Sequence, residues 1–274
     1  MGTLVRNSIS AGVAVVTRDN PPVNATSMAV TSELRGVLSE LRATPRLRAV
    51  IITGAGSRSF GAGSDLRELT DLLADRDALA RKLTLENDAF SQLAHFPVPV
   101  IAALNGDAFG GGLELALACD LIIAERGQRV GFPEVRLGLF PASGGPVRAM
   151  RRIGEGRTRQ MIYLGTPVTT EQAHGWGLVD QLVGAGDSLS AAMEVAGRFA
   201  IASASGLVAC KQSLLAATEA DDAAQVRHSL ALSETTFSHP DVREGVRAFL
   251  ARDSPRFSDR YPSSGFCIAE GCKG

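Results

Sequence analysis

The sequence predicts an α/β fold whose last third is entirely helical. In the first half, short runs rich in β-branched residues alternate with amphipathic helical segments, the pattern of an α/β domain. The chain has 274 residues, of which 45% are hydrophobic and 21% charged, enough to bury a sizeable core. We expect a core over residues 1–200, a helical region over 201–254 and an irregular tail over 255–274.

Periodicity predicts the elements of the first half in order. Apolar residues at helical spacing predict a helix over residues 28–42, which Thr26 or Ser27 is expected to cap at its start. A second helix is expected near residues 84–96. Short apolar runs that end at glycine or asparagine predict three strands, over residues 12–17, 49–53 and 98–104.

The second half begins with one more helix and strand and then turns helical. A short apolar helix is expected over residues 113–119 and a strand over 121–124. Residues 169–171 are expected to cap the next helix, and Gly175 or Gly177 to end it. The last four helices are predicted near residues 188–203, 206–219, 222–238 and 240–252.

Charge and hydropathy restrict the classes of partner. The formal net charge of −1 and pI near 6.4 provide no basic field over the surface, so we expect neither a nucleic-acid nor a membrane partner. No apolar stretch approaches the roughly 20 residues of a membrane span. Residues 1–16 lack a basic stretch followed by an apolar run, so a cytoplasmic location is expected.

The four cysteines suggest neither a disulfide framework nor a metal centre. No CxxC motif is present. Cys119 and Cys210 lie in apolar helical contexts, so we expect inert buried thiols there. His239 with Cys267 and Cys272 matches no zinc-ligand spacing, and we expect no metal.

The first candidate functional motif is residues 60–66 (FGAGSDL), which follows the strand at 49–53. Two glycines allow the backbone to turn sharply with its N–H groups pointing outward. Asp65 stands where a helix N-cap is expected. On its own the motif is also compatible with an ordinary turn and cap.

The second motif is residues 105–115 (NGDAFGGGLEL), at the end of the predicted strand 98–104. Its three consecutive glycines enter the first turn of a helix, where unpaired amides and the helix dipole favour an oxyanion. Neither a Walker ending nor a G-x-G-x-x-G fingerprint is present, which disfavours a nucleotide phosphate. Glu114 could also be an acid favoured only by the dipole.

The third motif is residues 131–141 (GFPEVRLGLFP), in which one acid stands among apolar residues. Such surroundings raise the pKa of a carboxylate, as proton transfer at neutral pH requires. Glu134 is therefore a candidate catalytic residue, and a salt bridge to Arg136 is the alternative explanation.

In this order and spacing, the three motifs resemble the crotonase superfamily, most closely its enoyl-CoA hydratase branch. The resemblance covers residues 10–257 and implies a crotonase-type ββα spiral with a helical C-terminal region that trims the site or extends onto a neighbour. It also implies a homotrimer or homohexamer. The segments that carry the resemblance are residues 20–25, 60–66, 100–120, 131–145, 164–165, 170–183 and 244–249.

The resemblance implies a thioester enolate held by two backbone amides, those of Ser64 and Gly111. Serine replaces the more usual alanine at position 64, and Gly61 stands where serine or cysteine is common. Both acids of the hydratase branch are present. By resemblance, Glu134 exchanges the proton at the α-carbon, and Glu114 holds and polarises the water added at the β-carbon.

Substrate contacts are expected from the loop after the first motif and from the C-terminal helices. The lysine usual beside the family's early Pro-x-x-x-Asn-Ala is replaced by prolines, so the phosphates of coenzyme A are assigned to arginines. Ser233 stands where the family often has an aromatic residue near the adenine, with Phe237 one turn later. The predicted substrate-binding residues are Ala62, Asp65, Arg67, Leu69, Phe140 and Arg252.

These expectations predict hydration of a trans-2-enoyl thioester, carried by coenzyme A or by an acyl-carrier protein, to a 3-hydroxyacyl thioester. No cofactor is expected besides the coenzyme A of the substrate. Two alternatives remain open: Δ3-Δ2 enoyl isomerisation with Glu134 as the only acid, and a non-catalytic acyl-CoA-binding or scaffold protein. Because Glu114 and Glu134 are both present, hydration is favoured.

Overall fold

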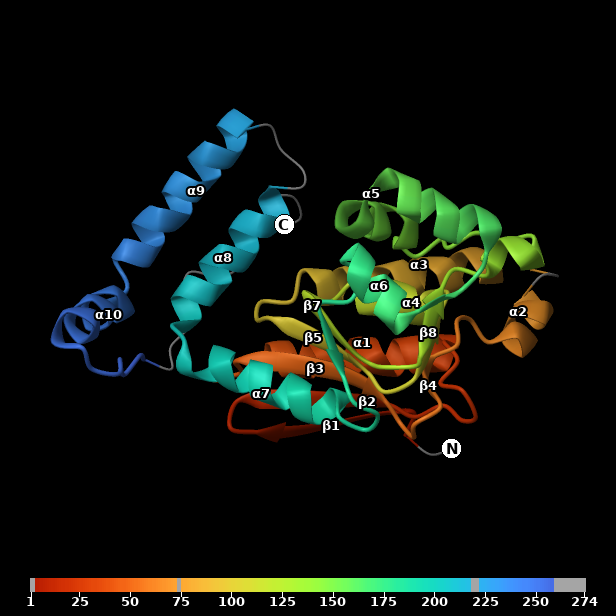
Figure 1. Ribbon diagram of the computed structural model, residues 1–274, viewed down its shortest axis with the longest axis horizontal. Helices are drawn as coiled ribbons and strands as arrows, with labels where there is room; N and C mark the ends of the chain where they lie inside the picture. The colour runs from red at the N-terminus through yellow and green to blue at the C-terminus, as the bar shows by residue number, and fades with distance from the viewer. Residues whose placement is uncertain (1–2, 73–74, 218–221, 259–274) are drawn as a thin grey trace.

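The computed structural model describes residues 3–72, 75–217 and 222–258 (Figure 1). Its centre is a six-stranded sheet in which β1 and β2 pair antiparallel and all other neighbours pair parallel. In spatial order the strands are β1 (Val5–Ser10), β2 (Val13–Arg18), β3 (Ala49–Gly54), β5 (Val100–Leu104), β7 (Leu121–Glu125) and β10 (Gln181–Val183).

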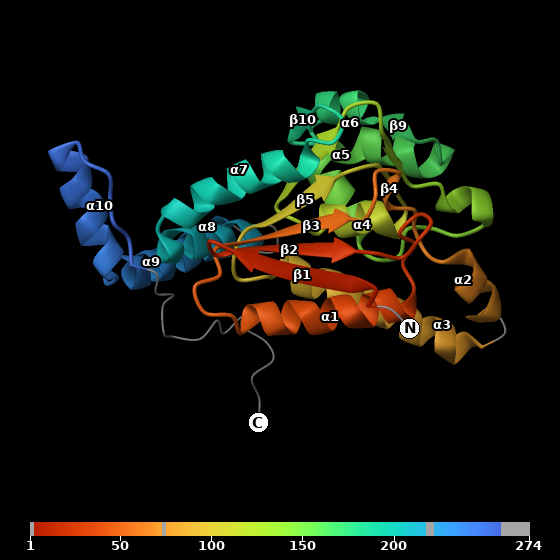
Figure 2. The ribbon, with the colours of Figure 1, turned by 90° about the horizontal axis from the view of Figure 1, so that it is seen from below.

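Helices cover both faces of this sheet (Figure 2). Parallel strands covered on both faces bury every side chain, which explains why β3 and β5 are continuous apolar runs. On one face α1 (Met28–Arg42) and α3 (Arg76–Ala94) lie side by side over the larger hydrophobic core. On the other face α7 (Ser188–Ile201) packs on β3 and β5.

A smaller, four-stranded sheet stands beside the first. Its strands have two or three residues each, and β4, β6 and β8 are parallel neighbours while β9 pairs antiparallel with β8. Their bounds are Ser59–Gly61 for β4, Asp107–Phe109 for β6, Arg129–Gly131 for β8 and Val168–Thr169 for β9.

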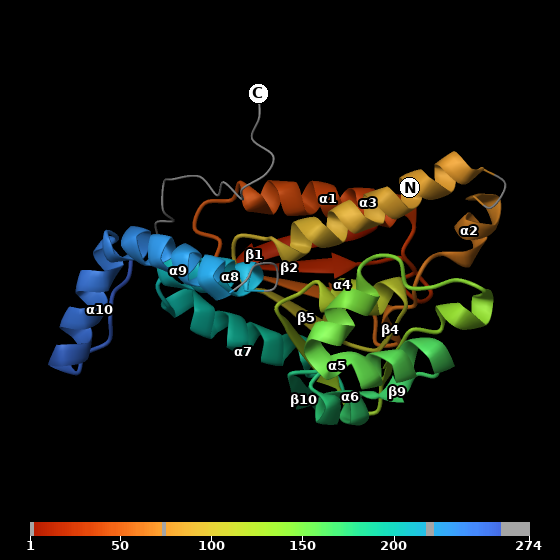
Figure 3. The ribbon, with the colours of Figure 1, turned by 90° about the horizontal axis from the view of Figure 1, so that it is seen from above.

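One group of helices follows the strands of the smaller sheet, and another ends the chain. The former are α2 (Leu66–Leu72), α4 (Gly111–Leu117), the 3-10 helix η1 (Glu134–Leu137), α5 (Gly145–Leu164) and α6 (Thr170–Trp176). The latter are α8 (Ala204–Ala216), α9 (Asp222–Phe237) and α10 (Pro240–Ala251). Figure 3 shows α9 and α10 extending away from the two sheets, at the opposite end of the molecule from α2.

Most predicted elements are confirmed and one burial prediction is wrong. The helix predicted over 28–42 has those bounds and Ser27 as its N-cap, and the N-cap of α6 is Thr169. Strand β1, for which no prediction was made, forms because it pairs with β2 as an antiparallel edge. Cys119 is buried as predicted, but Cys210 on α8 is exposed.

Two further observations concern membranes and metals. Among the described residues no single helix is long and apolar enough to cross a membrane, although the bent pair 188–200 and 204–216 reaches that length and composition together. Within the same ranges no three metal-binding side chains cluster. His239 caps α10, whereas Cys267, Cys272 and most of the predicted irregular tail lie outside the described residues.

Candidate active site

Three neighbouring strands of the smaller sheet end at the candidate site. In this sheet Gly61 pairs with Ala108, and Phe109 pairs with Gly131. The carboxyl ends of parallel strands meet at one edge of a sheet, where the loops that follow can present groups to a ligand. The four residues predicted as catalytic or oxyanion-binding come together at this edge: Ser64 after β4, Gly111 and Glu114 after β6, and Glu134 after β8.

Two backbone amides at this edge are free to bind an anion. The Thr26 amide donates to the Gly63 carbonyl at 2.7 Å and the Asp65 amide to the Thr26 carbonyl at 3.0 Å, which fixes the backbone on either side of Ser64. A Cβ atom on Gly63 would lie 3.9 Å from the Gly111 nitrogen, so the two turns are in contact. In the described part of the chain, neither the Ser64 nor the Gly111 amide donates to a protein acceptor.

Glu114 is buried in the first turn of α4 and held by the start of α5. Its side chain is 2% exposed, and Oε1 accepts the amides of Ser143 and Gly145, both at 2.8 Å. Oε2 makes no hydrogen bond with the described residues and remains available to a ligand. Burial raises the pKa of Glu114 to about 8, and the charges of Glu86 and Glu134 add to this rise against the two amides, which lower it.

Glu134 opens the 3-10 helix after β8 and faces the glycine turn. A Cβ atom on Gly110 would lie 2.8 Å from Glu134 Oε1, so only glycine leaves room for the carboxyl group there. Oε2 is buried without a hydrogen-bond partner among the described residues. Burial raises the pKa of Glu134 to about 7, and the Glu86 charge contributes in the same direction. Arg136 donates to Thr166 Oγ1 at 3.0 Å, and no salt bridge joins it to Glu134 in the part described.

The unusual glycine at position 61 has a structural reason. A Cβ atom there would lie 2.7 Å from Nη1 of Arg18, a side chain that is 1% exposed. Arg18 donates to the carbonyl of Asn24 at 3.0 Å and to Thr26 Oγ1 at 2.9 Å, so it supports the segment that fixes Ser64. Burial lowers the pKa of Arg18 to about 10, but this value is still well above neutral pH, so the side chain stays charged.

Sequence reasoning missed a buried pair next to the acids. Lys82 and Glu86 on α3 are each 2% exposed. The sequence does contain an indication that the two side chains are buried, because they share helical spacing with the buried residues Ala89, Phe90 and Leu93. However, a Lys–Glu pair spaced i, i+4 is also common on solvent-exposed helix faces, so the spacing alone does not distinguish a buried pair from an exposed one.

The predicted substrate-binding residues fall into two groups. Ala62 lies in the loop after β4, and Asp65 caps α2 by accepting the amides of Arg67 and Glu68 at 2.9 and 3.4 Å. Arg67 is exposed and Leu69 half-buried on the same short helix.

Of the other two predicted contacts, Phe140 follows the Leu139 amide that donates to the Glu134 carbonyl at 3.0 Å, and only Arg252 lies far from the acids. Phe140 is 70% exposed after η1. Arg252 ends α10 at the far end of the molecule, so one chain does not bring it to Glu114 and Glu134 (Figure 1).

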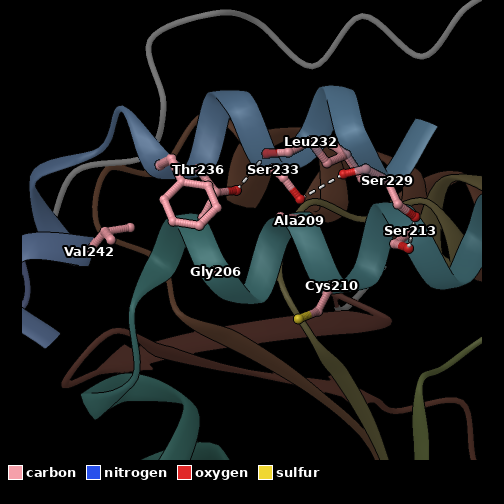
Figure 4. Close-up of a pocket in the computed structure, with 10 residues that line it drawn as sticks. Gly206, Ala209, Cys210, Ser213, Ser229, Leu232, Ser233, Thr236 and Val242 are labelled. Atoms are coloured by element: carbon pink, nitrogen blue, oxygen red, sulfur yellow. Dashed lines mark hydrogen bonds between the residues drawn. The ribbon is translucent and has the colours of Figure 1, made fainter. Parts of the chain in front are cut away.

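A cavity lies between α8 and α9 (Figure 4). Its volume is about 430 Å³, and its wall includes Ser213, Ser229 and Ser233 together with Leu232 and Phe237. Ser233 and Phe237 are the two positions considered above for adenine contact. They lie on a helix remote from the glutamates, which separates this cavity from the candidate active site within one chain.

Comparison with known proteins identifies the fold. An enoyl-CoA hydratase of Bacillus anthracis superposes with a TM-score of 0.90 at 28% identity, over 94% of this chain and all of that one. The short-chain-enoyl-CoA hydratase of Clostridium acetobutylicum is 35% identical over 243 residues, 88% of this chain and 92% of that protein. The 2,3-dehydroadipyl-CoA hydratase of Escherichia coli is 32% identical over 249 residues, 90% and 96% of the two chains.

The architecture, with its glycine turns and short second sheet, is therefore the crotonase fold predicted from the sequence. Residues 8–260 match the family described as enoyl-CoA hydratase/isomerase. The chain belongs to this family, whose members act on acyl-CoA thioesters.

Proposed function

We propose that the protein hydrates a trans-2-enoyl thioester to the 3-hydroxyacyl thioester, and catalyses the reverse dehydration. The observation that carries this proposal is the pair of buried acids, Glu114 and Glu134, beside the two free amides of Ser64 and Gly111. Names of similar proteins support it, since one is named short-chain-enoyl-CoA hydratase and another 2,3-dehydroadipyl-CoA hydratase.

In the proposed hydration, the thioester oxygen accepts the Ser64 and Gly111 amides. The oxygen of water bonds to the β-carbon while Glu114 takes the water proton, and the π electrons move onto the thioester as an enolate. Glu134 then delivers its proton to the α-carbon and the enolate collapses. Dehydration runs these steps in reverse, with Glu134 taking the α-proton and Glu114 protonating the departing hydroxide.

The raised pKa values of the acids bear on both directions of the reaction. With the pKa of Glu114 at about 8 and that of Glu134 at about 7, the pair carries one proton near neutral pH. Hydration uses the form with this proton on Glu134, and dehydration uses the form with it on Glu114.

The direct test is an acyl-CoA panel with product identification, applied to the wild type and to Glu114→Gln. The glutamine can still accept the Ser143 and Gly145 amides, so the fold is preserved. We expect crotonyl-CoA hydration to fall by roughly 10²–10⁴-fold, the usual contribution of a general acid or base. Hydration that survives within about tenfold would show that the paired-glutamate mechanism is wrong.

Δ3-Δ2 isomerisation is the second candidate, because Glu134 alone combines a pKa near 7 with an unpaired buried oxygen. Glu114→Gln separates the two reactions. An isomerase retains its rate with a 3-enoyl-CoA in this variant, whereas Glu134→Gln abolishes both activities.

We also propose that the chain assembles as a homotrimer or homohexamer. The support is the apolar surface on the extended C-terminal helices, where Phe237, Phe249 and Leu250 are 75–84% exposed. Such an assembly would allow Arg252 and the cavity between α8 and α9 to face the substrate of a neighbouring copy. We further propose that Arg67 and Arg252 bind the phosphates of the substrate. These phosphates belong either to coenzyme A or to the thioester arm of a carrier protein.

A further inference from the structure

A buried ion pair on α3 lies next to the candidate acids and has no part in the steps above. Lys82 Nζ is 3.0 Å from Glu86 Oε2, and the two side chains are 2% and 3% exposed. Removing two charges from water is unfavourable even when they pair, and hydrophobic side chains of similar size would often be as stable. The position of the pair therefore suggests a role in the site.

Glu86 is linked to Glu114 through one residue. Glu86 Oε1 accepts the hydroxyl of Ser143 at 3.1 Å, and the amide of the same serine donates to Glu114 Oε1 at 2.8 Å. Arg148 Nη1 donates to the Ser143 carbonyl at 2.8 Å. Ser143 is thus held at three points, and its orientation determines how it binds the Glu114 carboxylate.

The pair also contacts the oxyanion hole. Lys82 Nζ is 3.4 Å from the hydroxyl of Ser64, and a Cβ atom on Gly111 would lie 2.9 Å from Glu86 Oε1. The Glu86 carboxylate therefore packs against Gly111, the residue whose amide is proposed to bind the oxyanion. An unbalanced negative charge there would oppose an enolate, and Lys82 cancels it.

Other charged groups face the pair from each surrounding element. They are Arg18 on β2, Glu68 on α2 at 4.0 Å from Lys82 Nζ, Glu114 on α4, Glu134 on η1, and Arg148 at the start of α5. Glu86 acts on three of them, since its charge raises the pKa of Arg18, Glu114 and Glu134.

We propose that Lys82 and Glu86 are positioning residues of the active site: Glu86 orients Ser143 so that its amide holds Glu114, and Lys82 balances the Glu86 charge beside the oxyanion hole. The inference rests on the proposed function, because it assigns the pair to the same acid–base reaction. It adds a third carboxylate and a lysine to the residues that control that reaction.

The two members of the pair have opposite electrostatic effects on the acids. Glu86→Gln keeps the shape and removes a negative neighbour, so Glu114 and Glu134 should ionise at a pH lower by roughly one unit. Lys82→Met leaves Glu86 unbalanced, so both should ionise at a pH higher by roughly one unit. In the double variant, Lys82→Met with Glu86→Gln, the ionisation midpoints of Glu114 and Glu134 should return toward those of the wild type. Ser143→Ala should lower kcat roughly tenfold without moving the midpoints, since the Glu86 charge stays.

The experiment measures ionisation without turnover. Infrared difference titration follows the carbonyl band of protonated carboxylic acid, and Glu114→Gln and Glu134→Gln variants assign the two signals. The same variants are then assayed for the pH profile of kcat/KM with crotonyl-CoA. Lys211→Met is the control, because Lys211 is a buried lysine on a different part of the protein, 2.7 Å from the partly exposed Asp120.

The expected result is opposite shifts for Glu86→Gln and Lys82→Met and no shift for Lys211→Met. Shifts in the same direction, or unmoved midpoints in folded variants, would overturn the inference. If Lys82→Met does not fold, the midpoints in Glu86→Gln and in the double variant test the inference. Neither of these variants leaves an unpaired carboxylate at position 86. A wild type inactive on every acyl-CoA but with the expected shifts would refute the proposed function alone. Normal turnover with unmoved midpoints would refute only the positioning role of Lys82 and Glu86.

Discussion

The two candidate acids have the same side chain in different surroundings. Glu114 is buried and has one oxygen fixed by two amides, whereas Glu134 is half-buried with one oxygen unpaired. Burial raises the pKa of both, but the restraint on Glu114 limits where it can move. Such surroundings suit Glu114 to hold a water molecule in place and Glu134 to reach the α-carbon.

A bell-shaped pH profile follows from these pKa values. The reactive form of the pair carries one proton, so kcat/KM should be maximal between about pH 7 and about pH 8 and fall on either side. The measurement is the pH dependence of crotonyl-CoA hydration below saturation. A profile that stays flat from about pH 6 to about pH 9 would contradict a one-proton pair.

The same values predict that the protein is less stable at higher pH. A carboxyl group whose pKa is raised from 4.5 to about 8 binds more protons in the folded than in the unfolded state within that window. The free energy of unfolding therefore falls as pH rises through it, by about 1.4 kcal/mol per unit for each such group. Urea unfolding at about pH 5.5 and about pH 7.5, at one protein concentration, measures this slope.

Glu114→Gln provides the control for that slope, because the amide does not titrate. We expect the free energy of unfolding of the variant to fall less steeply with pH than that of the wild type, by about 1.4 kcal/mol per pH unit. An unchanged slope would show that Glu114 is not protonated in the folded protein.

For single residues, the sequence predicts the amide donors and the acids of the site but not the side chains that hold them in place. Ser64, Gly111, Glu114 and Glu134 were named from glycine context and order, and the structure places them together; their roles stay predictions. Arg18, Lys82 and Ser143 were missed. Their contacts join segments that are far apart in sequence, and no local pattern records such pairings.

Among the elements, α4 and β4 are in close backbone contact at Gly112 and Gly61. A Cβ atom on Gly112 would overlap the Gly61 carbonyl oxygen, a backbone atom that cannot move without shifting its strand. The three consecutive glycines thus serve different needs: room for Glu134 at Gly110, room for Glu86 at Gly111, and backbone contact at Gly112.

Gly112→Ala should therefore lower the free energy of unfolding by more than about 3 kcal/mol, because overpacking against backbone cannot relax cheaply. Gly156→Ala is the matched control. Gly156 lies within α5 with no atom within 4 Å of its added Cβ, and alanine there should stabilise by about 0.5–1 kcal/mol. Thermal unfolding of both variants tests the contrast, and equal stabilities would contradict it.

Length decides which elements were predictable. The fifteen residues of α1 provide four helical turns of apolar spacing, and β3 and β5 are continuous apolar runs. Strands β4, β6, β8 and β9 have two or three residues, too few for alternation to be recognised. These short strands hold the site, so its layout depended on resemblance rather than on periodicity.

The whole molecule divides into a double-sheet body and C-terminal helices with an apolar surface. Lys211 on α8 ties the first of these helices to Asp120 after α4. Beyond α8, side chains of α9 and α10 such as Phe249 are largely exposed. A second copy of the chain is the occupant proposed for that surface.

Light scattering after gel filtration should therefore give three or six times the chain mass of 28.7 kDa. Phe249→Ser should shift the protein toward smaller species, because Phe249 is 84% exposed in one chain and buries apolar area only in an assembly. Ile9→Ser, at an exposed position on β1, is the control and should leave the mass unchanged. A monomeric wild type would refute the proposed assembly.

The contact of Arg18 with Gly61 makes the residues tolerated at these two positions depend on each other. The guanidinium occupies the volume that a Cβ atom at position 61 needs, so a serine there would displace it from its hydrogen bonds to Asn24 and Thr26. A shorter side chain at position 18 frees that volume. A library that randomises both positions together should therefore recover pairs of residues that neither single substitution tolerates.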